Sequence, residues 1–150
     1  MKEMTLRSEA FNDHTIIPSE YSHDSGDVSP PLEWSDAPDE VVEIALACED
    51  PDAPTGTFAH WLVAGIDPVT TGLDPGERPT GAVLGRNDYG AEGYGGPKPP
   101  IGDDPHRYFF RLYGLSEPSG LGTGFTAEDL RNAMQDKIVA AGTLVGTFAR

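Results

Sequence analysis

The sequence has a single cysteine, few basic residues and no long apolar run, and each scarcity narrows what the chain can be. Cys48 has no partner for an internal disulfide, which agrees with a reducing compartment, and its run of apolar neighbours favours a small buried core residue over a nucleophile. No stretch is apolar enough to span a bilayer, and residues 1–10 lack the apolar segment of a signal peptide. We therefore expect a cytoplasmic protein without integral membrane association.

The shortage of basic residues leaves a strongly acidic chain. Its 10 Lys and Arg residues stand against 25 Asp and Glu residues, so the formal net charge is −15, and the only lysines are Lys2, Lys98 and Lys137. A field of this sign repels nucleic acid and anionic membrane surfaces, so we expect neither as a partner. The composition resembles that of proteins from salt-loving organisms, whose acidic, lysine-poor surfaces keep them soluble in concentrated salt.

The length and the turn residues indicate one β-rich domain. At 150 residues the chain can form one well-packed core but is short for two domains, so we expect a single domain over residues 1–150. Short apolar or aromatic runs bounded by turn residues predict strands at residues 41–48, 58–65, 81–86, 108–115 and 143–149. This pattern favours a mainly β fold, a two-sheet β-sandwich, over a doubly wound sheet.

Only residues 126–142 carry a convincing helical pattern. Thr126 suits the N-cap, and Asp129 suits the third helical position of a capping box. Apolar residues then recur at i, i+4 and i+8 as far as a stop at Gly142: they are Leu130, Met134 and Ile138. We expect one helix in the C-terminal half, followed by a closing strand.

Several common catalytic signatures are missing. There is no G-x-S-x-G, no P-loop and no complete G-x-G-x-x-G, and the glycines at 93, 95 and 96 are not followed by a helical pattern. Hydrolase elbows and nucleotide-binding folds are therefore not expected. What remains is E-D-P-D-A-P at 49–54, A-H-W at 59–61 and P-H-R-Y at 105–108, each at the end or start of an expected strand.

Strand alternation brings four polar side chains to one place. It puts His60 on the face of Phe58 and Leu62, and it groups His106 with Tyr108 and, further along, Phe110 and Leu112. Imidazoles and a phenol can donate hydrogen bonds to a small anion, and a carboxylate on one ring nitrogen fixes the tautomer. We prefer Asp50 to Asp52 as that carboxylate, because Asp50 directly ends the first strand while Asp52 lies between two prolines.

A purely structural interpretation competes with each of these assignments. A histidine in an apolar strand is more often a hydrogen-bonded core residue than a ligand group, and an Asp-Pro-Asp-Ala-Pro segment is more often a turn. Trp61 and the aromatic residues at 109, 110 and 113 are most simply core. We interpret His14 and His23, in polar segments, as surface residues.

Six blocks, taken in order, resemble a known family. They are S-P-P-L-E-W at 29–34, E-D-P-D-A-P at 49–54, H-W-L-V at 60–63, G-Y-G-G-P-K-P-P at 93–100, P-H-R-Y at 105–108 and L-V-G-T-F at 144–148. Together they resemble the phosphatidylethanolamine-binding protein family and, more narrowly, its prokaryotic Raf-kinase-inhibitor-like branch. The resemblance implies a two-sheet antiparallel β-sandwich with few helices, and a pocket for phosphate-like head groups.

The resemblance also assigns the pocket residues by position. The family motifs fall on Asp50, Pro54, His60, His106 and Tyr108, and its glycine-proline segment falls on residues 96–100, which include Gly96 and Pro97 as ligand-binding candidates. Many prokaryotic relatives have cysteine where this chain has Lys98, which either extends toward an anion or points to solvent; we favour solvent. Animal relatives cover the pocket with a C-terminal helix, whereas this chain stops after its last expected strand, so we expect an open pocket.

The leading hypothesis is a non-catalytic binder of small phosphorylated or other anionic ligands, with no cofactor and no bound metal. His60, His106 and Tyr108 would donate hydrogen bonds, and Asp50 would orient a histidine. A rival hypothesis is a metal-assisted hydrolase using both histidines and Asp50. A third is a protein-interaction module that regulates a partner such as a kinase through the pocket rim. The resemblance also suggests a homodimer.

Overall fold

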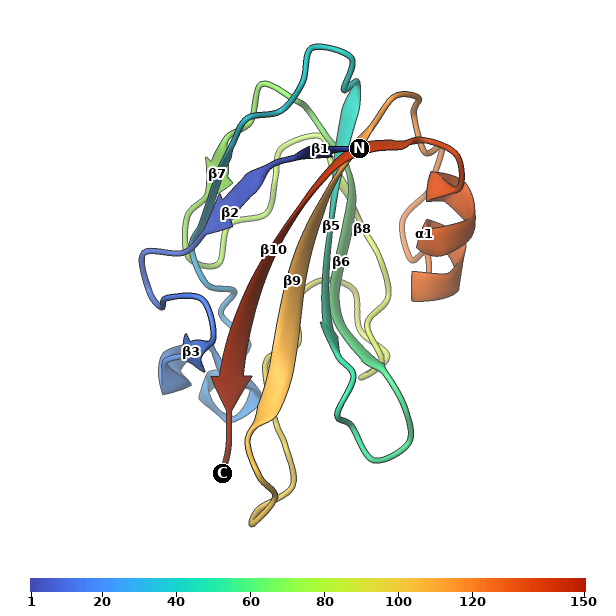
Figure 1. Cartoon of the computed structure of the whole chain (residues 1–150). Coiled ribbons are helices and arrows are strands. Elements are labelled where there is room, and N and C mark those ends of the chain that lie inside the picture. The colour runs from blue at the N-terminus through green and yellow to red at the C-terminus, as the bar shows by residue number, and fades with distance from the viewer.

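The computed structural model describes residues 1–150 as two β-sheets and one α-helix (Figure 1). The larger, seven-stranded sheet has the order β1-β10-β9-β5-β6-β8, with β3 also paired to β10, and the smaller, three-stranded sheet has the order β2-β4-β7. In Figure 1 the larger sheet lies between the smaller sheet on the left and helix α1 on the right. The mainly β, two-sheet fold expected from the sequence is confirmed.

The long strands form the centre of the larger sheet and pair with one another in antiparallel fashion. They are β5 (Glu43–Asp50), β6 (Phe58–Ile66), β9 (His106–Leu115) and β10 (Ile138–Phe148). Short strands complete the edges of this sheet, and β1 and β3 join β10 in parallel: β1 (Lys2–Glu3), β3 (Thr15–Ile16) and β8 (Val83–Leu84). The smaller sheet contains β2 (Thr5–Arg7), β4 (Leu32–Ser35) and β7 (Gly72–Leu73).

Each face of the larger sheet buries its own apolar cluster. On β9, alternate residues starting at His106 are buried, as the alternation predicted, and Tyr108, Phe110 and Leu112 pack against Trp34 of the smaller sheet within one cluster. The opposite face carries alanines of β5 and β6 together with Leu130 and Met134 of the helix. Small side chains on this face let α1 approach the sheet closely. Cys48 is buried in the first cluster, as expected.

Helix α1 (Ala127–Met134) begins as predicted and ends earlier. Thr126 accepts a hydrogen bond from the Asp129 backbone N–H, and the Asp129 carboxylate accepts one from the Thr126 N–H, which completes the capping box. The predicted continuation through Ile138 to Gly142 is wrong. Asp136 turns the chain with a φ of 65°, and Ile138 pairs with Leu115 as the first residue of β10. At Ile138, pairing with β9 is therefore favoured over a further turn of the helix.

The other differences concern the shortest elements. The strand expected at 81–86 is only β8, and the strands near the N-terminus and β7 were not predicted, because two or three residues give no recognisable periodicity. Two short 3₁₀ turns, η1 (Ser19–Tyr21) and η2 (His23–Ser25), follow β3. None of the helices has the length and apolar composition needed to cross a membrane.

Strand β6 contains an irregularity at His60. The pairing with β5 shifts there, because Cys48 pairs with Trp61 while the next residue, Glu49, pairs with Ala59. One residue of β6, His60, is therefore extra, which is the arrangement of a β-bulge. The prediction that Leu62 shares the face of His60 is wrong for this reason: past the bulge, Leu62 lies in the cluster under α1.

Candidate ligand-binding pocket

A cavity of about 270 Å³ opens at one end of the larger sheet, where β5 ends and β6 and β9 begin. Because these strands run antiparallel, the end of one and the starts of its two neighbours meet at the same edge. The strand ends and the turn after β5 contribute Asp50, Ala53, Pro54, Thr55, Phe58, His60, His106 and Tyr108 to its lining. The long loops before β9 contribute Tyr89, Lys98, Pro99 and Pro100.

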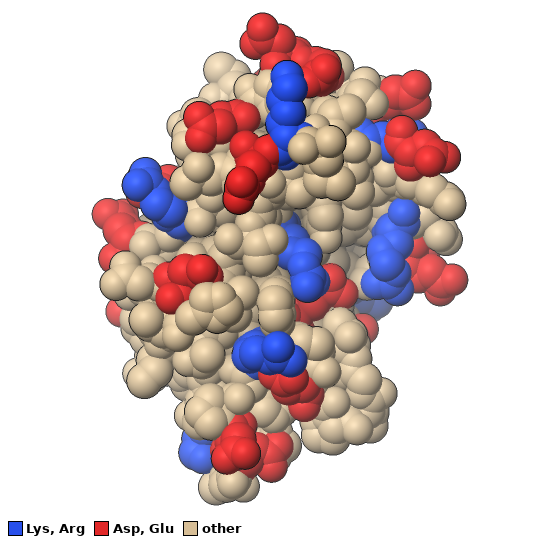
Figure 2. All heavy atoms as spheres, in the orientation of Figure 1, with Lys and Arg blue, Asp and Glu red and all other residues tan.

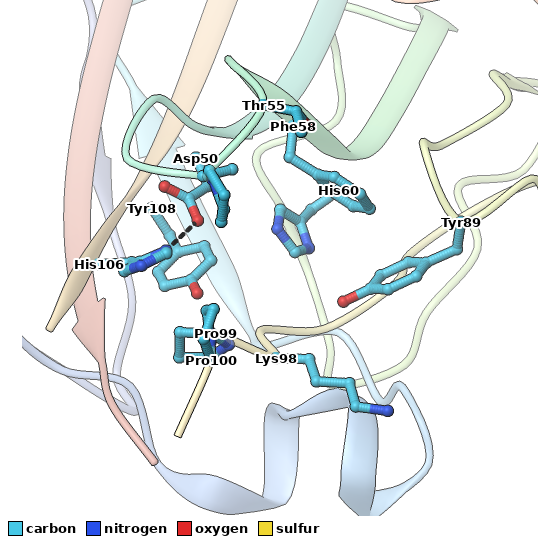
Figure 3. Close-up of a pocket in the computed structure, with 12 residues that line it drawn as sticks. Asp50, Thr55, Phe58, His60, Tyr89, Lys98, Pro99, Pro100, His106 and Tyr108 are labelled. Carbon is cyan, nitrogen blue, oxygen red and sulfur yellow. Dashed lines mark hydrogen bonds and ion pairs between the residues drawn. The ribbon is translucent and has the colours of Figure 1, made fainter. Parts of the chain in front are cut away.

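His106 lies between two carboxylates. Its Nδ1 is 2.7 Å from Oδ2 of Asp50, and its Nε2 is 3.1 Å from Oδ2 of Asp103 (Figure 3 shows the first contact). Burial lowers the pKa of His106, but the hydrogen bonds to Asp50 and Asp103 outweigh burial, and the net pKa is raised. An imidazolium with both N–H groups donated fits this geometry. Asp50 therefore orients a histidine, as the sequence suggested.

His60 has a different environment on the opposite side of the cavity. Its Nδ1 lies 2.6 Å from the carbonyl oxygen of Gly95, and its own carbonyl accepts a hydrogen bond from the Gly95 N–H at 2.8 Å. The ring packs edge-on against Tyr108, with the ring centroids 5.2 Å apart. Burial lowers the pKa of His60. The bulge in β6 places this ring at the pocket wall beside Phe58, whose ring centroid is 4.7 Å away.

The Tyr108 hydroxyl has no hydrogen-bond partner, although the residue is only 1 % exposed. Burial, and then the nearby Asp50 carboxylate, raise the pKa of Tyr108, so the phenol keeps its proton. A buried hydroxyl without a partner costs about 1 to 3 kcal/mol. In Figure 3 the hydroxyl points into the space between His106, His60 and the loop at Pro99. The protein thus presents a donor there that no acceptor of the chain engages.

The turn that carries Asp50 is fixed from both of its ends. The Asp52 N–H donates to Oδ1 of Asp50 at 2.7 Å, and the Asp52 carboxylate accepts two bonds from the Arg107 guanidinium and one from its backbone N–H. The Arg107 hydrogen bonds lower the pKa of Asp52 to about 2. Asp52 thus holds the turn against β9, and Asp50 is left free to contact His106.

A layer behind the pocket holds the glycine-rich loop in place. Gly96 donates to Oδ1 of Asp27, and its carbonyl accepts from the Tyr89 hydroxyl at 2.7 Å. The His23 ring stacks on Tyr89 with centroids 4.3 Å apart and bonds Asp27 at 2.8 Å. His23 is therefore a partly exposed surface residue that also packs on the loop, and His14 is exposed as expected.

The structure gathers most of the predicted residues around the cavity. Asp50, His60, His106 and Tyr108 surround it, and Pro54 lies on its rim. Gly96 and Pro97, expected to contact ligand, do not line it. A Cβ at residue 96 would collide with the backbone of Tyr21 and Ser22, so this glycine allows close packing against η1 and η2 instead. The Pro97 carbonyl accepts from the His23 N–H behind the wall.

Sequence reasoning missed several lining residues. Pro99 and Pro100 lie within the matching glycine-proline segment, and Phe58 shares the predicted face of His60. The sequence therefore contained information that placed these three residues near the pocket. No sequence pattern pointed to Thr55 and Tyr89, because loops place these two residues at the cavity. Lys98 is exposed and extends away from the histidines (Figure 3), as favoured from the sequence. Arg150 bonds the Pro99 carbonyl at 2.7 Å and fixes this loop at its back.

The histidines and Asp50 do not converge on a common point as metal ligands would. Asp50 bonds His106 directly, and Nδ1 of His60 is taken by a carbonyl. No group of three or more His, Cys, Asp or Glu side chains is placed to hold a metal ion. The arrangement is that of a partly open, mainly apolar pocket with one free hydroxyl donor.

Fold and cavity together define a β-sandwich protein with a cavity at its strand ends. The sequence profile of the phosphatidylethanolamine-binding protein family matches residues 7–149. The chain belongs to this family. The resemblance of the motifs to the phosphatidylethanolamine-binding protein family is thereby confirmed.

Relatives and solved structures agree with this assignment. A UPF0098 protein of Methanothermobacter thermautotrophicus is 44% identical over 152 residues, covering 98% of this chain and 99% of the relative. A phosphatidylethanolamine-binding protein homologue from Chlamydia trachomatis superposes with a TM-score of 0.92 at 38% identity, over 100% of this chain and 99% of its own. E. coli YbcL gives 0.92 at 27% identity, with 98% of both chains covered.

One relative bears on location. A Mycobacterium tuberculosis protein that carries the lipoprotein name LppC is 38% identical over 145 residues, covering 97% of this chain and 70% of the relative. Members of the family thus include one named as a lipoprotein. The cytoplasmic location expected from the sequence stays a prediction.

Proposed function

We propose that this protein is a non-catalytic binder of small molecules that carry a phosphate-like oxyanion, and that the cavity at the strand ends is its binding site. The observation that carries the proposal is the Tyr108 hydroxyl, which is buried, has no partner and points into the cavity. Buried polar groups are hydrogen-bonded in the great majority of cases, so an unpartnered one at a cavity indicates a missing acceptor. An oxyanion oxygen is such an acceptor.

The surroundings of the hydroxyl support an anionic ligand of small size. His106 carries a positive charge beside it, and the cavity of about 270 Å³ is close to the lower limit of about 300 Å³ for drug-sized ligands. A phosphate group with a short substituent fits this volume. The neutral walls formed by Phe58 and the prolines shield the site from water and strengthen each hydrogen bond.

The charge of the whole protein opposes the approach of such a ligand. Acidic side chains are scattered over the face shown in Figure 2, with basic ones among them, and the formal net charge is −15. Long-range attraction therefore does not drive binding, and short-range donors must supply the affinity. Added neutral salt screens the repulsion and should raise the association rate.

Titration with inorganic phosphate tests the proposal. We expect saturable shifts of the His60 and His106 imidazole NMR signals at millimolar phosphate, and a loss of affinity of about tenfold in Tyr108→Phe, because one hydrogen bond is removed. Tyr113→Phe is the matched control: this tyrosine lies on the same strand, outside the cavity, and should leave binding unchanged.

The stability of Tyr108→Phe separates binding from folding. Because the hydroxyl has no partner, its removal should leave the free energy of unfolding unchanged or raise it by up to about 1 kcal/mol. Phosphate that leaves both imidazole signals of the folded protein unmoved would refute the proposed function.

A further inference from the structure

The tautomer of His60 is determined by its contact with Gly95. A carbonyl oxygen can only accept a hydrogen bond, so Nδ1 of His60, 2.6 Å away, must carry the proton. In a neutral imidazole the other nitrogen, Nε2, then has a lone pair and no proton. Nε2 has no partner within the protein, since Nδ1 makes the ring's only hydrogen bond, and the ring lies in the wall of the cavity.

The groups that face His60 leave its ring neutral. Burial is the main influence on its pKa and lowers it, against smaller opposite effects from the backbone of Gly95 and Gly96 and from Asp50 and Asp88. The titratable groups around the ring come from every neighbouring element: Asp50 on β5, Asp88 and Tyr89 on the loop after β8, and His106 and Tyr108 on β9. Asp88 already bonds the Ala59 N–H at 2.7 Å, Asp50 is shared with His106, and Lys98 extends away.

The inner end of the cavity therefore offers both kinds of hydrogen-bonding group. Tyr108 offers a donor with no acceptor, and Nε2 of His60 offers an acceptor with no donor, on rings whose centroids are 5.2 Å apart. The Asp50 carboxylate, 3% exposed, is a further acceptor in the lining. A fully deprotonated oxyanion would satisfy Tyr108 but would bring its oxygens against lone pairs at His60 and Asp50.

We propose that the pocket selects oxyacids that still carry one proton, taking a phosphate monoester as R–O–PO₃H⁻ and discriminating against sulfate esters, which have no such proton. The P–OH group donates to Nε2 of His60, and an unprotonated oxygen of the same phosphate accepts from the Tyr108 hydroxyl. His106 compensates the remaining negative charge together with that of Asp50. This inference rests on the proposed function, since it specifies the form in which the same site takes its ligand.

The proton balance gives the inference a measurable consequence. A phosphate monoester loses its second proton at a pKa of about 6, so at about pH 5 it brings the required proton, whereas at about pH 8 the dianion must take up one proton from solvent on binding. A sulfate ester is deprotonated throughout this range. It can complete the same contacts only if the buried His60 is protonated instead.

Calorimetric titration with methyl phosphate and methyl sulfate tests this in the wild-type protein. At about pH 5 we expect methyl phosphate to bind at least about tenfold more tightly, one hydrogen bond being lost with the sulfate. The ratio of the two affinities should fall as the pH rises through the phosphate pKa and should approach one when the dianion predominates. Within about one pH unit above that pKa, titrations in two buffers of different ionisation enthalpy should show net proton uptake on binding of methyl phosphate and none on binding of methyl sulfate. Loss of charge on His106 affects both ligands, so it does not change the ratio.

His60→Gln provides a second test, because an amide can donate as well as accept. This variant should bind the two esters with similar affinity and take up less than half of the wild-type proton, while the exposed His14→Gln keeps the wild-type ratio and uptake. Equal affinities of the wild type for both esters, or phosphate binding without proton uptake above the ligand pKa, would overturn the inference and leave the proposed function intact. Failure of both esters to bind at any pH would remove the proposed function itself.

Discussion

The two histidines of the pocket are equally buried and yet have opposite tendencies to hold a proton. His60 is 3% exposed and His106 is 4% exposed, and they lie on strands of the same sheet. His106 has a carboxylate on each ring nitrogen and its pKa is raised, whereas His60 has a carbonyl on one nitrogen and nothing on the other, and its pKa is lowered. Burial lowers the pKa of both rings, and only His106 has carboxylate partners that outweigh it.

Because of this difference, the two sides of the pocket offer a ligand different hydrogen-bonding groups. On the β9 side the His106 pKa is raised, which favours an imidazolium beside Asp50, and on the β6 side the His60 pKa is lowered, which favours a neutral ring that can accept a hydrogen bond from a ligand. A site with two imidazoliums would bind any small anion. By the inference above, this site instead prefers an oxyanion that still carries one acidic proton. The contrast between the two rings can be tested by replacing the carboxylates beside His106 or by replacing either histidine.

The largest effect is expected from Asp50→Asn. This change removes the buried charge that holds His106 protonated, and breaking one partner of a buried ion pair costs about 3 to 5 kcal/mol of unfolding free energy. The pKa of His106 should fall toward that of His60, which would abolish the contrast. Urea unfolding and the imidazole NMR titration measure these two changes. Asp104→Asn, at an exposed aspartate two residues before His106, is the control and should change neither.

A moderate effect is expected when either His106 or His60 is replaced and the stability is measured against pH. The pH dependence of the stability loss should have opposite sign for the two histidines. A raised pKa means that His106 stabilises the fold fully below the unfolded pKa of about 6.5 and that this contribution is lost as the pH rises through its folded value. For His60 the pKa is lowered, so its contribution is present above about pH 6.5 and is lost as the pH falls through its folded value.

Thermal unfolding from about pH 5 to about pH 8 would therefore separate the two. His106→Gln should be most destabilised, relative to wild type, at the acidic end, and His60→Gln should be most destabilised at the alkaline end. Parallel curves for the two variants would contradict the assignment of opposite charge states. His14→Gln, at an exposed histidine, serves as the reference for the loss of an imidazole that lies outside the pocket.

The smallest effect is expected from Asp103→Asn. Asp103 is 45% exposed and contacts Nε2 of His106 at 3.1 Å, so solvent screens this ion pair and its contribution is at most about 1 kcal/mol. The pKa of His106 should fall, but less than in Asp50→Asn, and phosphate affinity should rise because Nε2 becomes free to donate. An unchanged His106 titration curve would show that Asp50 alone holds the proton.

The central strands and the main site residues could be predicted from the sequence, because their signals are local. The apolar runs and the alternation around His106 and Tyr108 are visible without a structure, and so is the capping box at Thr126. The end of α1 could not be placed, because Ile138 continues the helical pattern and only its pairing with Leu115 assigns it to a strand.

The features missed at the site depend on contacts between distant segments. The bulge at His60 exists only relative to β5, so alternation within β6 alone put Leu62 on the wrong face. The carbonyl that sets the His60 tautomer belongs to Gly95, 35 residues away, and the second carboxylate on His106 comes from a loop whose course the sequence does not specify. The sequence placed Asp50, both histidines and Tyr108 together, but it did not show how each histidine holds its protons.

The bulge in β6 has a consequence for how this site can be lost or gained during evolution. Because His60 is the extra residue of the pairing, deletion of its single codon would leave Trp61 opposite Cys48 and Ala59 opposite Glu49, in one continuous ladder. The scaffold would keep its register while the proton-accepting ring disappeared. An in-frame deletion of three nucleotides would thus remove this ring from the cavity without shifting the pairing of β6, and the reverse insertion would restore it.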